Sequence, residues 1–297
     1  MTSIGFVGLG HMGGNMAARF LAGGYPVYGT ERNRAHAQGL MHDDLQWCAS
    51  SREVAEAADV IFTSLPDDRA LDAVASGADG IVAGLAPGKI WVDMSTVSPR
   101  VSREIAARVQ ARGARMLDAP VSGSVPQVKT GTLTIMVGGE EQAFARVEPI
   151  LRALGTPTLV GENGQGLVLK LAINISLAVQ MLAFAEGLLL AERAGIDRKL
   201  AVDVMTRSPI GSPMLKARAA LVLDLPDEAW FDIGLMQKDV VLALDAARQL
   251  HVPLPSAAAA DELLTVARAL GYERRDLAAL FEVLGRIAGS PVDAEPD

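Results

Sequence analysis

Three glycines with the spacing G-x-G-x-x-G, directly after the first apolar run, constrain the fold of this chain more than any other feature. The run Ile4–Val7 has the length of a buried strand, and the residues after Gly13 have the periodicity of a helix. Gly8 allows a tight turn, Gly10 lets the main chain approach a ligand, and Gly13 lets the helix pack closely on the strand. The chain is therefore predicted to open with a strand, a tight turn and a helix.

The first half of the chain alternates short apolar runs with amphipathic segments. The predicted strands are Ile4–Val7, Val27–Thr30, Val60–Ser64, Ile90–Asp93, Met116–Ala119, Leu133–Val137 and Thr158–Val160. The segments between them include the predicted helices Met12–Leu21, Arg100–Ala111 and Gln142–Leu154. Alternating strands and helices predict βαβ units with a mainly parallel sheet. The fold class is thus α/β, with a Rossmann-type domain over residues 1–162.

After about residue 161 the strand pattern disappears. One helix is predicted from Gly166 to Arg193, with Gly195 as its C-terminal cap and Asp197 at the start of the next helix. Further predicted helices are Lys199–Thr206, Met214–Leu221, Gly234–Gln249, Ala257–Leu270 and Leu277–Ala288. Residues 163–297 are therefore predicted to form an all-helical substrate and dimerisation domain that ends in a disordered tail, Ser290–Asp297.

The segment Leu167–Leu190 is apolar enough to suggest a membrane helix. Lys170, Asn174, Gln180 and Glu186 interrupt it on several faces, however. A helix buried within the protein or at a subunit interface explains both features better. The prediction is a homodimer or homotetramer without a membrane partner.

Composition narrows the possible partners and compartment. The formal net charge of −8 provides no basic surplus for a nucleic-acid partner. A single cysteine, Cys48, cannot form an intrachain disulfide, and no basic segment precedes the first apolar run. These features predict a cytoplasmic location. A local cationic pocket for a small anion remains compatible with the overall charge.

The glycine loop predicts a dinucleotide site, because main-chain N–H groups at a helix start bind a pyrophosphate. The predicted contacts are Gly8, Leu9, Gly10, His11, Met12 and Gly13. His11 would lie beside the phosphates rather than at the nicotinamide. At the end of the second strand, Glu31 favours NAD by binding the ribose hydroxyls, whereas Arg32 favours the 2′-phosphate of NADP. Together these two residues predict a slight preference for NAD over NADP.

Two further segments contain candidate substrate residues. The Ser122 hydroxyl and the N–H groups around Gly123 have the character of a carboxylate site, although a plain strand-to-helix turn would look similar. Lys170 and Asn174 lie four residues apart on one face of the long apolar helix. Burial would lower the lysine pKa towards a range useful for proton transfer. A lysine that reaches solvent at a domain edge is the alternative.

Together these motifs resemble the β-hydroxyacid dehydrogenase family, which includes 3-hydroxyisobutyrate dehydrogenase. The shared motifs are Gly8–Gly13, a D-x-P-V-S-G segment at Asp118–Gly123, and G-x-G-x-x-x-K-x-x-x-N at Gly164–Asn174. The segments Asp93–Thr96 and Lys238-Asp239 also match, so the resemblance covers about residues 3–288. Three motifs in the same order are far more specific than any single one.

The resemblance implies a role for each matched residue. Lys170 would be the catalytic acid/base, and Ser122 and Gly123 would hold the substrate carboxylate. Asn174 would bind substrate and orient Lys170. The residues that would line or cover the cofactor are Leu65, Pro66, Thr96 and Lys238. The implied activity is hydride transfer between NAD or NADP and a small carboxylated aldehyde, keto acid or hydroxy acid, with no metal.

Some features are similar to those of glyoxylate and succinic semialdehyde reductases, among them Ser124, Phe231 and the segment Gly211–Met214. Two features depart from that subfamily. Glu31-Arg32-Asn33 replaces an Asn-Arg-Thr segment, which puts a preference for NADP in doubt. Gln127-Val128 replaces a pair of small residues, so the substrate loop is expected to have a different shape.

Two alternative functions fit the same architecture. An imine reductase shares the fold but typically lacks the lysine, so Lys170 and Asn174 favour carbonyl chemistry. A catalytically inactive cofactor-binding protein is the other alternative, and the retained lysine argues against it as well.

Overall fold

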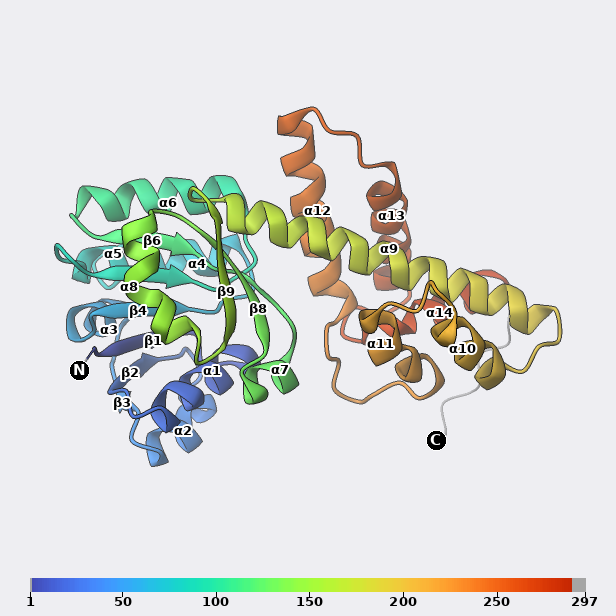
Figure 1. The fold of residues 1–297 in the computed structure, drawn as a ribbon, viewed down its shortest axis with the longest axis horizontal. Coiled ribbons are helices and arrows are strands. Elements are labelled where there is room, and N and C mark those ends of the chain that lie inside the picture. The colour runs from blue at the N-terminus through green and yellow to red at the C-terminus, as the bar shows by residue number, and fades with distance from the viewer. Residues whose placement is uncertain (1, 290–297) are drawn as a thin grey trace. The chain divides into compact units, whose positions relative to one another are not determined.

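The computed structural model describes residues 2–289 (Figure 1), so the predicted disorder of Ser290–Asp297 concerns residues outside the described range. The chain separates into two compact units, one ending at Leu171 and the other beginning at Ala172. Helix α9 (Gln165–Arg193) starts in the first unit and continues into the second.

The first unit is built on one sheet with the order β3-β2-β1-β4-β5-β6-β8-β7, and β9 pairs with β8. The strands are β1 (Ile4–Val7), β2 (Val27–Thr30), β3 (Gln46–Trp47), β4 (Val60–Thr63), β5 (Ile90–Asp93), β6 (Arg115–Asp118), β7 (Val121–Ser122), β8 (Leu133–Gly138) and β9 (Gly155–Gly161). Strands β1 to β6 run parallel, and β8 is antiparallel to β6 and β7. The predicted α/β class and mainly parallel sheet are confirmed.

Helices cover both faces of this sheet. They are α1 (His11–Ala22), η1 (Arg34–Ala37), α2 (Gln38–His42), α3 (Ser51–Ala57), α4 (Asp68–Ala75), α5 (Ile81–Gly84), α6 (Pro99–Ala111), α7 (Val125–Thr130) and α8 (Glu141–Leu151). Successive strand residues enter opposite cores: Phe6 packs in one with Phe20 and Phe62, and Val7 packs in the other with Trp91. This two-sided burial explains the continuous apolar runs of the central strands.

Among its described residues, the regular secondary structure of the second unit is helical, apart from one isolated bridge between Asp232 and Asp276. It contains most of α9 and then α10 (Arg198–Arg207), α11 (Pro213–Leu223), α12 (Ile233–Leu250), α13 (Pro255–Ala269), η2 (Leu277–Ala279) and α14 (Leu280–Ile287). The predicted caps are confirmed. Gly195 has φ +87°, and Asp197 Oδ1 accepts the Leu200 N–H at 2.8 Å.

Helix α9 is long and apolar enough to cross a membrane by length and composition alone. A third of its most apolar stretch is buried in the structure. The core helix of a protein without a membrane partner passes the same test, so this feature by itself is weak evidence for a membrane span.

Two short strands depart from the prediction. β3 (Gln46–Trp47) extends the sheet beyond β2, and β7 (Val121–Ser122) lies inside the segment expected to be a loop. In β7, Val121 pairs with Ile135 and Ser122 with Thr134 of the antiparallel β8. Strands of two residues form through pairing with a neighbour rather than through a local pattern, so the sequence gives little sign of them.

Candidate active site

The glycine loop has room for a ligand where the motif requires it. A Cβ on Gly8, at φ +93°, would lie 2.5 Å from the Ser64 carbonyl oxygen, and a Cβ on Gly13 would lie 2.0 Å from that of Gly8. Among the described residues, apart from Gly10 itself and its two chain neighbours, no heavy atom lies within 4 Å of a Cβ built on Gly10, which is the N-cap of α1 and provides no side-chain cap. The helix start therefore presents main-chain N–H groups to an open space, which fits a dinucleotide pyrophosphate.

Glu31 lies directly after β2 and is bound to this loop. Its Oε2 accepts the Leu9 N–H at 2.7 Å, and its Oε1 accepts the Arg32 N–H at 2.8 Å. These two bonds hold the carboxylate beside the glycine loop, where the adenosine ribose of a dinucleotide lies in this type of fold. Arg32 is exposed.

A buried hydrogen-bond network joins the loops that follow β4 and β5. The Ser95 hydroxyl donates to Asp93 Oδ1 at 2.6 Å and accepts the Leu65 N–H at 2.9 Å. Because these loops contain Leu65, Pro66 and Thr96, the network holds all three predicted cofactor contacts at one edge of the sheet.

The substrate segment leaves the same edge. β6 ends at Asp118, which pairs in register with Asp93 of β5, and Gly123 has φ +127°. The Gln127 side-chain carbonyl accepts the Ser124 N–H at 2.9 Å. A Cβ on Gly123 would lie 3.0 Å from the Cβ of Gln127. The unusual Gln127 thus packs on the predicted carboxylate loop and occupies one of its amides.

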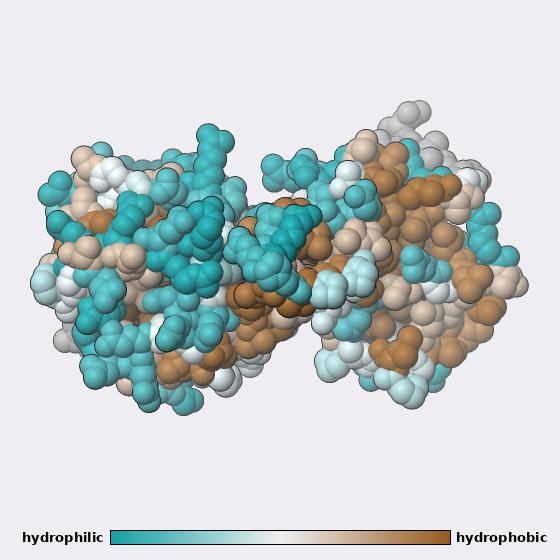
Figure 2. Space-filling view, turned by 90° about the horizontal axis from the view of Figure 1, so that it is seen from above, coloured by the Kyte–Doolittle hydropathy of each residue, from teal (hydrophilic) through white to brown (hydrophobic). Residues whose placement is uncertain are grey.

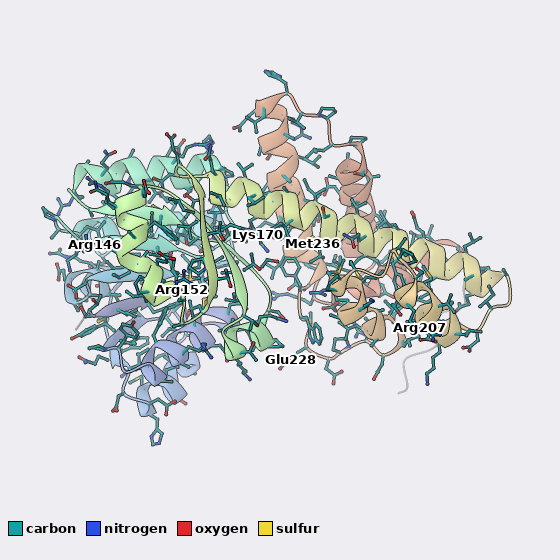
Figure 3. All side chains as sticks on the ribbon, viewed as in Figure 1. Arg146, Arg152, Lys170, Arg207, Glu228 and Met236 are labelled. Atoms are coloured by element: carbon teal, nitrogen blue, oxygen red, sulfur yellow. The ribbon has the colours of Figure 1, made fainter. Side chains whose placement is uncertain are left out.

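Lys170 lies near the beginning of α9 (Figure 3). Its side chain is buried, with 9% exposed. The start of this helix is bound to the end of β6. Asp118 Oδ1 accepts the Gly164 N–H at 2.6 Å, and Oδ2 accepts the Leu167 N–H at 3.0 Å. Burial raises the Asp118 pKa to about 6, against the opposing effect of these hydrogen bonds. Lys170 therefore follows a helix start that is anchored at the sheet edge.

In the second unit, Asn174 and Lys238 meet at one carboxylate. Asn174 Nδ2 donates to Asp239 Oδ2, and Lys238 Nζ lies 3.0 Å from Asp239 Oδ1. Asn174 and Asp239 are both buried. Since its amide nitrogen faces Asp239, the Asn174 carbonyl oxygen points away from that carboxylate.

The predicted site residues thus form two groups, one in each unit. In the first unit, the glycine loop, Glu31, the loops of Leu65 and Thr96, and the segment of Ser122 all follow carboxyl ends of strands, and Lys170 lies near the start of α9. The second group contains Asn174 and Lys238.

Sequence reasoning assigned no role to three buried carboxylates, Asp93, Asp118 and Asp239. An aspartate at the end of an apolar strand run is a signal for Asp93 and Asp118, because a buried charge needs hydrogen-bond partners.

Two family profiles together cover almost the whole chain. Residues 3–164 match the NAD binding domain of 6-phosphogluconate dehydrogenase. Residues 164–284 match the domain described as NAD-binding of NADP-dependent 3-hydroxyisobutyrate dehydrogenase.

Relatives of known activity align over most of their length. A 2-(hydroxymethyl)glutarate dehydrogenase from Eubacterium barkeri is 34% identical over 97% of both chains. A 2-hydroxy-3-oxopropionate reductase from Escherichia coli is 36% identical over 96% of this chain and 98% of its own. The chloroplastic glyoxylate/succinic semialdehyde reductase 2 of Arabidopsis thaliana is 33% identical over 95% of this chain and 79% of its own.

Solved structures of similar proteins have the same fold. A Mycobacterium tuberculosis 3-hydroxyisobutyrate dehydrogenase described with L-serine has a TM-score of 0.84 and 30% identity, covering 96% of this chain and 99% of that one. An imine reductase from Pseudomonas sp., at a TM-score of 0.60 and 24% identity, shares the fold more distantly. The chain therefore belongs to the β-hydroxyacid dehydrogenase family and is an NAD(P)-dependent oxidoreductase.

Proposed function

We propose that this enzyme interconverts a small carboxylated aldehyde or keto acid and its hydroxy acid, with Lys170 as the acid/base. The observation that carries the proposal is the place of Lys170: a buried lysine on a helix whose first turn is bound to Asp118, the residue that leads into the Ser122–Gly123 loop. The relatives named above act on small carboxylated substrates, which supports the same class.

Each residue has a defined task in this proposal. The Ser122 hydroxyl and the Gly123 N–H bind the substrate carboxylate. The Lys170 ammonium polarises the carbonyl oxygen and gives it a proton during reduction, and the neutral amine takes that proton back during oxidation. Asn174 binds the substrate and orients Lys170, and Asp239 holds its amide nitrogen. The bound nicotinamide supplies or accepts the hydride.

For the cofactor we propose a slight preference for NAD. Glu31 is held at the glycine loop by two main-chain bonds, so its charge opposes a 2′-phosphate at that position. Arg32 follows directly and attracts such a phosphate, which keeps the preference small.

We further propose that the second unit binds a second copy of the chain, in a homodimer or homotetramer. Figure 2 shows hydrophobic residues spread over the surface of this unit. Exposed apolar side chains on α9, α10 and the segments beside them are Leu190, Ile196, Leu200, Val204 and Ile210. Exposed apolar patches of large size are rare on monomers. Sedimentation at micromolar concentration tests this point, and a monomer mass would contradict it.

The compartment that we propose is the cytoplasm. Cys48 is buried and free, which agrees with a reducing environment. The Arabidopsis relative is chloroplastic, so the family itself is not restricted to one compartment.

The decisive experiment compares succinic semialdehyde with butanal, which has the same chain length without the carboxylate. Loss of a charge-assisted pair of hydrogen bonds should lower kcat/KM about 30- to 1,000-fold. Both aldehydes are assayed with the same reduced cofactor by its absorbance, and a cyclic imine is included. Equal efficiencies for the two aldehydes would exclude the carboxylate site, and faster turnover of the imine would favour imine reduction.

A further inference from the structure

Asp118 is a fully buried carboxylate that none of the proposed chemical steps uses. It ends β6, yet its two oxygens accept hydrogen bonds from a segment 46 and 49 residues further along the chain. The donors are the N–H of Gly164, just before α9, and the N–H of Leu167, the third residue of that helix. One side chain of the sheet therefore binds both ends of the first turn of α9.

The first N–H groups of a helix have no partner within the helix, and a local side chain normally accepts them. In a capping box, the N-cap side chain accepts the N–H at the third helical position, and the third side chain accepts the N-cap N–H. Gly164 has no side chain for the first task. The Asp118 side chain accepts both N–H groups, those of Gly164 and Leu167. It also places a carboxylate at the positive end of a 29-residue helix.

Two glycines pack closely against the Asp118 carboxylate. A Cβ on Gly138 would lie 2.7 Å from Asp118 Oδ1, and a Cβ on Gly166 would lie 2.8 Å from Oδ2. The helix start can approach the end of β6 this closely only because those positions lack side chains. The Asp118 carboxylate is therefore packed closely against Gly138 of β8 and against Gly166 of α9.

We propose that Asp118 is a positioning residue, which holds the Lys170 ammonium in register with the Ser122–Gly123 loop. The loop leaves β6 directly after Asp118, and Lys170 follows Leu167 by three residues, or about 4.5 Å along the helix axis. This inference rests on the proposed role of Lys170. A displacement of about 1 Å in a catalytic group can cost about 100-fold in rate, so loss of the anchor should act on turnover.

The test is Asp118→Asn, which keeps the shape but turns an amide N–H towards a main-chain N–H. We expect kcat to fall about 10- to 100-fold, whereas the Kd of the cofactor, followed by tryptophan fluorescence, changes less than about twofold. The matched control is Asp197→Asn, the same change at the N-cap of α10. Its kcat should stay within about twofold of the wild type.

A double variant separates positioning from general damage. If Asp118 acts through Lys170, then kcat of Asp118→Asn/Lys170→Ala should equal that of Lys170→Ala within about twofold. A further loss that multiplies the effect of Lys170→Ala overturns the proposal, and so does an unchanged kcat in Asp118→Asn alone. An unchanged kcat in Lys170→Ala overturns the proposed function instead, and the positioning role with it.

A second variant decides the question if Asp118→Asn does not fold. The Asn163 amide donates to the Met116 carbonyl at 2.8 Å and supports the same turn without removing the Asp118 charge. Asn163→Ala should lower kcat about three- to tenfold with an unchanged cofactor Kd, and should have no effect in the Lys170→Ala background. Faster hydrogen exchange at residues 165–170 should accompany the loss. A wild-type kcat in this variant overturns the proposal.

Discussion

Buried carboxylates bind main-chain N–H groups in both units, but their charges are balanced differently. In the first unit, Asp118 accepts the N–H groups of Gly164 and Leu167. In the second unit, Asp276 lies 3.1 Å from the Arg218 guanidinium and also accepts the N–H groups of Trp230 and Phe231, shortly before α12. Amides balance the first charge, and a full opposite charge balances the second.

The two carboxylates differ in whether a cation lies beside them. In a parallel sheet the carboxyl ends of the strands meet at one edge, where the following loops offer free N–H groups. Asp276 also accepts main-chain N–H groups, from Trp230, Phe231 and Ala278, but the buried Arg218 guanidinium adds a full positive charge beside it. The buried carboxylate of the sheet unit is thus held by main-chain and side-chain N–H groups, whereas that of the helical unit is also paired with a cation.

Lys170→Ala should produce the largest effect, because it removes the proposed acid/base from the sheet unit. General acid–base catalysis contributes about 10²- to 10⁴-fold, and kcat should fall by this factor with little change in cofactor affinity. Lys238→Ala in the helical unit is the comparison, with a smaller loss of kcat and a weaker affinity for cofactor. Steady-state kinetics and fluorescence titration measure both. Retention of more than a tenth of wild-type activity in Lys170→Ala contradicts the assignment.

Asp276→Ala should cause the largest loss of stability, because it leaves the buried Arg218 without its counter-charge. Breaking a buried ion pair costs about 3–5 kcal/mol. The control is Asp245→Ala, which removes an exposed pair with Arg248 and should cost less than about 1 kcal/mol. Urea unfolding of both variants measures the difference. Equal losses would mean that burial does not distinguish these pairs.

The dependence of stability on pH tests whether burial raises the pKa of Asp118. Its pKa in the folded protein is about 6, above the ordinary value of 3.8, so the folded state binds an extra proton between these values. The contribution of this group to the free energy of unfolding should therefore fall as pH rises from about 4 to 6, by up to about 3 kcal/mol. Asp118→Asn should lack this slope, whereas Asp276→Asn should retain it. Parallel curves for wild type and Asp118→Asn would contradict the raised pKa.

Glu31→Ala should have the smallest effect, a shift in cofactor preference. Removing the carboxylate that binds Leu9 leaves Arg32 to attract a 2′-phosphate, so the ratio of kcat/KM for NADP to that for NAD should rise about tenfold. Arg32→Ala should move the ratio the other way. If neither variant changes the ratio, these residues do not contact the ribose.

Local patterns were sufficient where one segment determines its own structure. The predicted strands all occur with ends shifted by at most a few residues, and the caps at Gly195 and Asp197 are as expected. The spacing of Gly8, Gly10 and Gly13 already predicted a strand, a turn and a helix, because side chains at Gly8 and Gly13 would collide with the main chain while Gly10 faces open space.

By itself, therefore, the sequence determined the class of fold, the cofactor loop and the family, since each depends on motifs of a few neighbouring residues. Only the tertiary structure decided what the buried carboxylates do. Asp118 and Gly164 are 46 residues apart, and Asn174 and Asp239 are 65 apart. No local pattern records such a pairing, because a buried charge requires a partner but does not specify which segment will supply it.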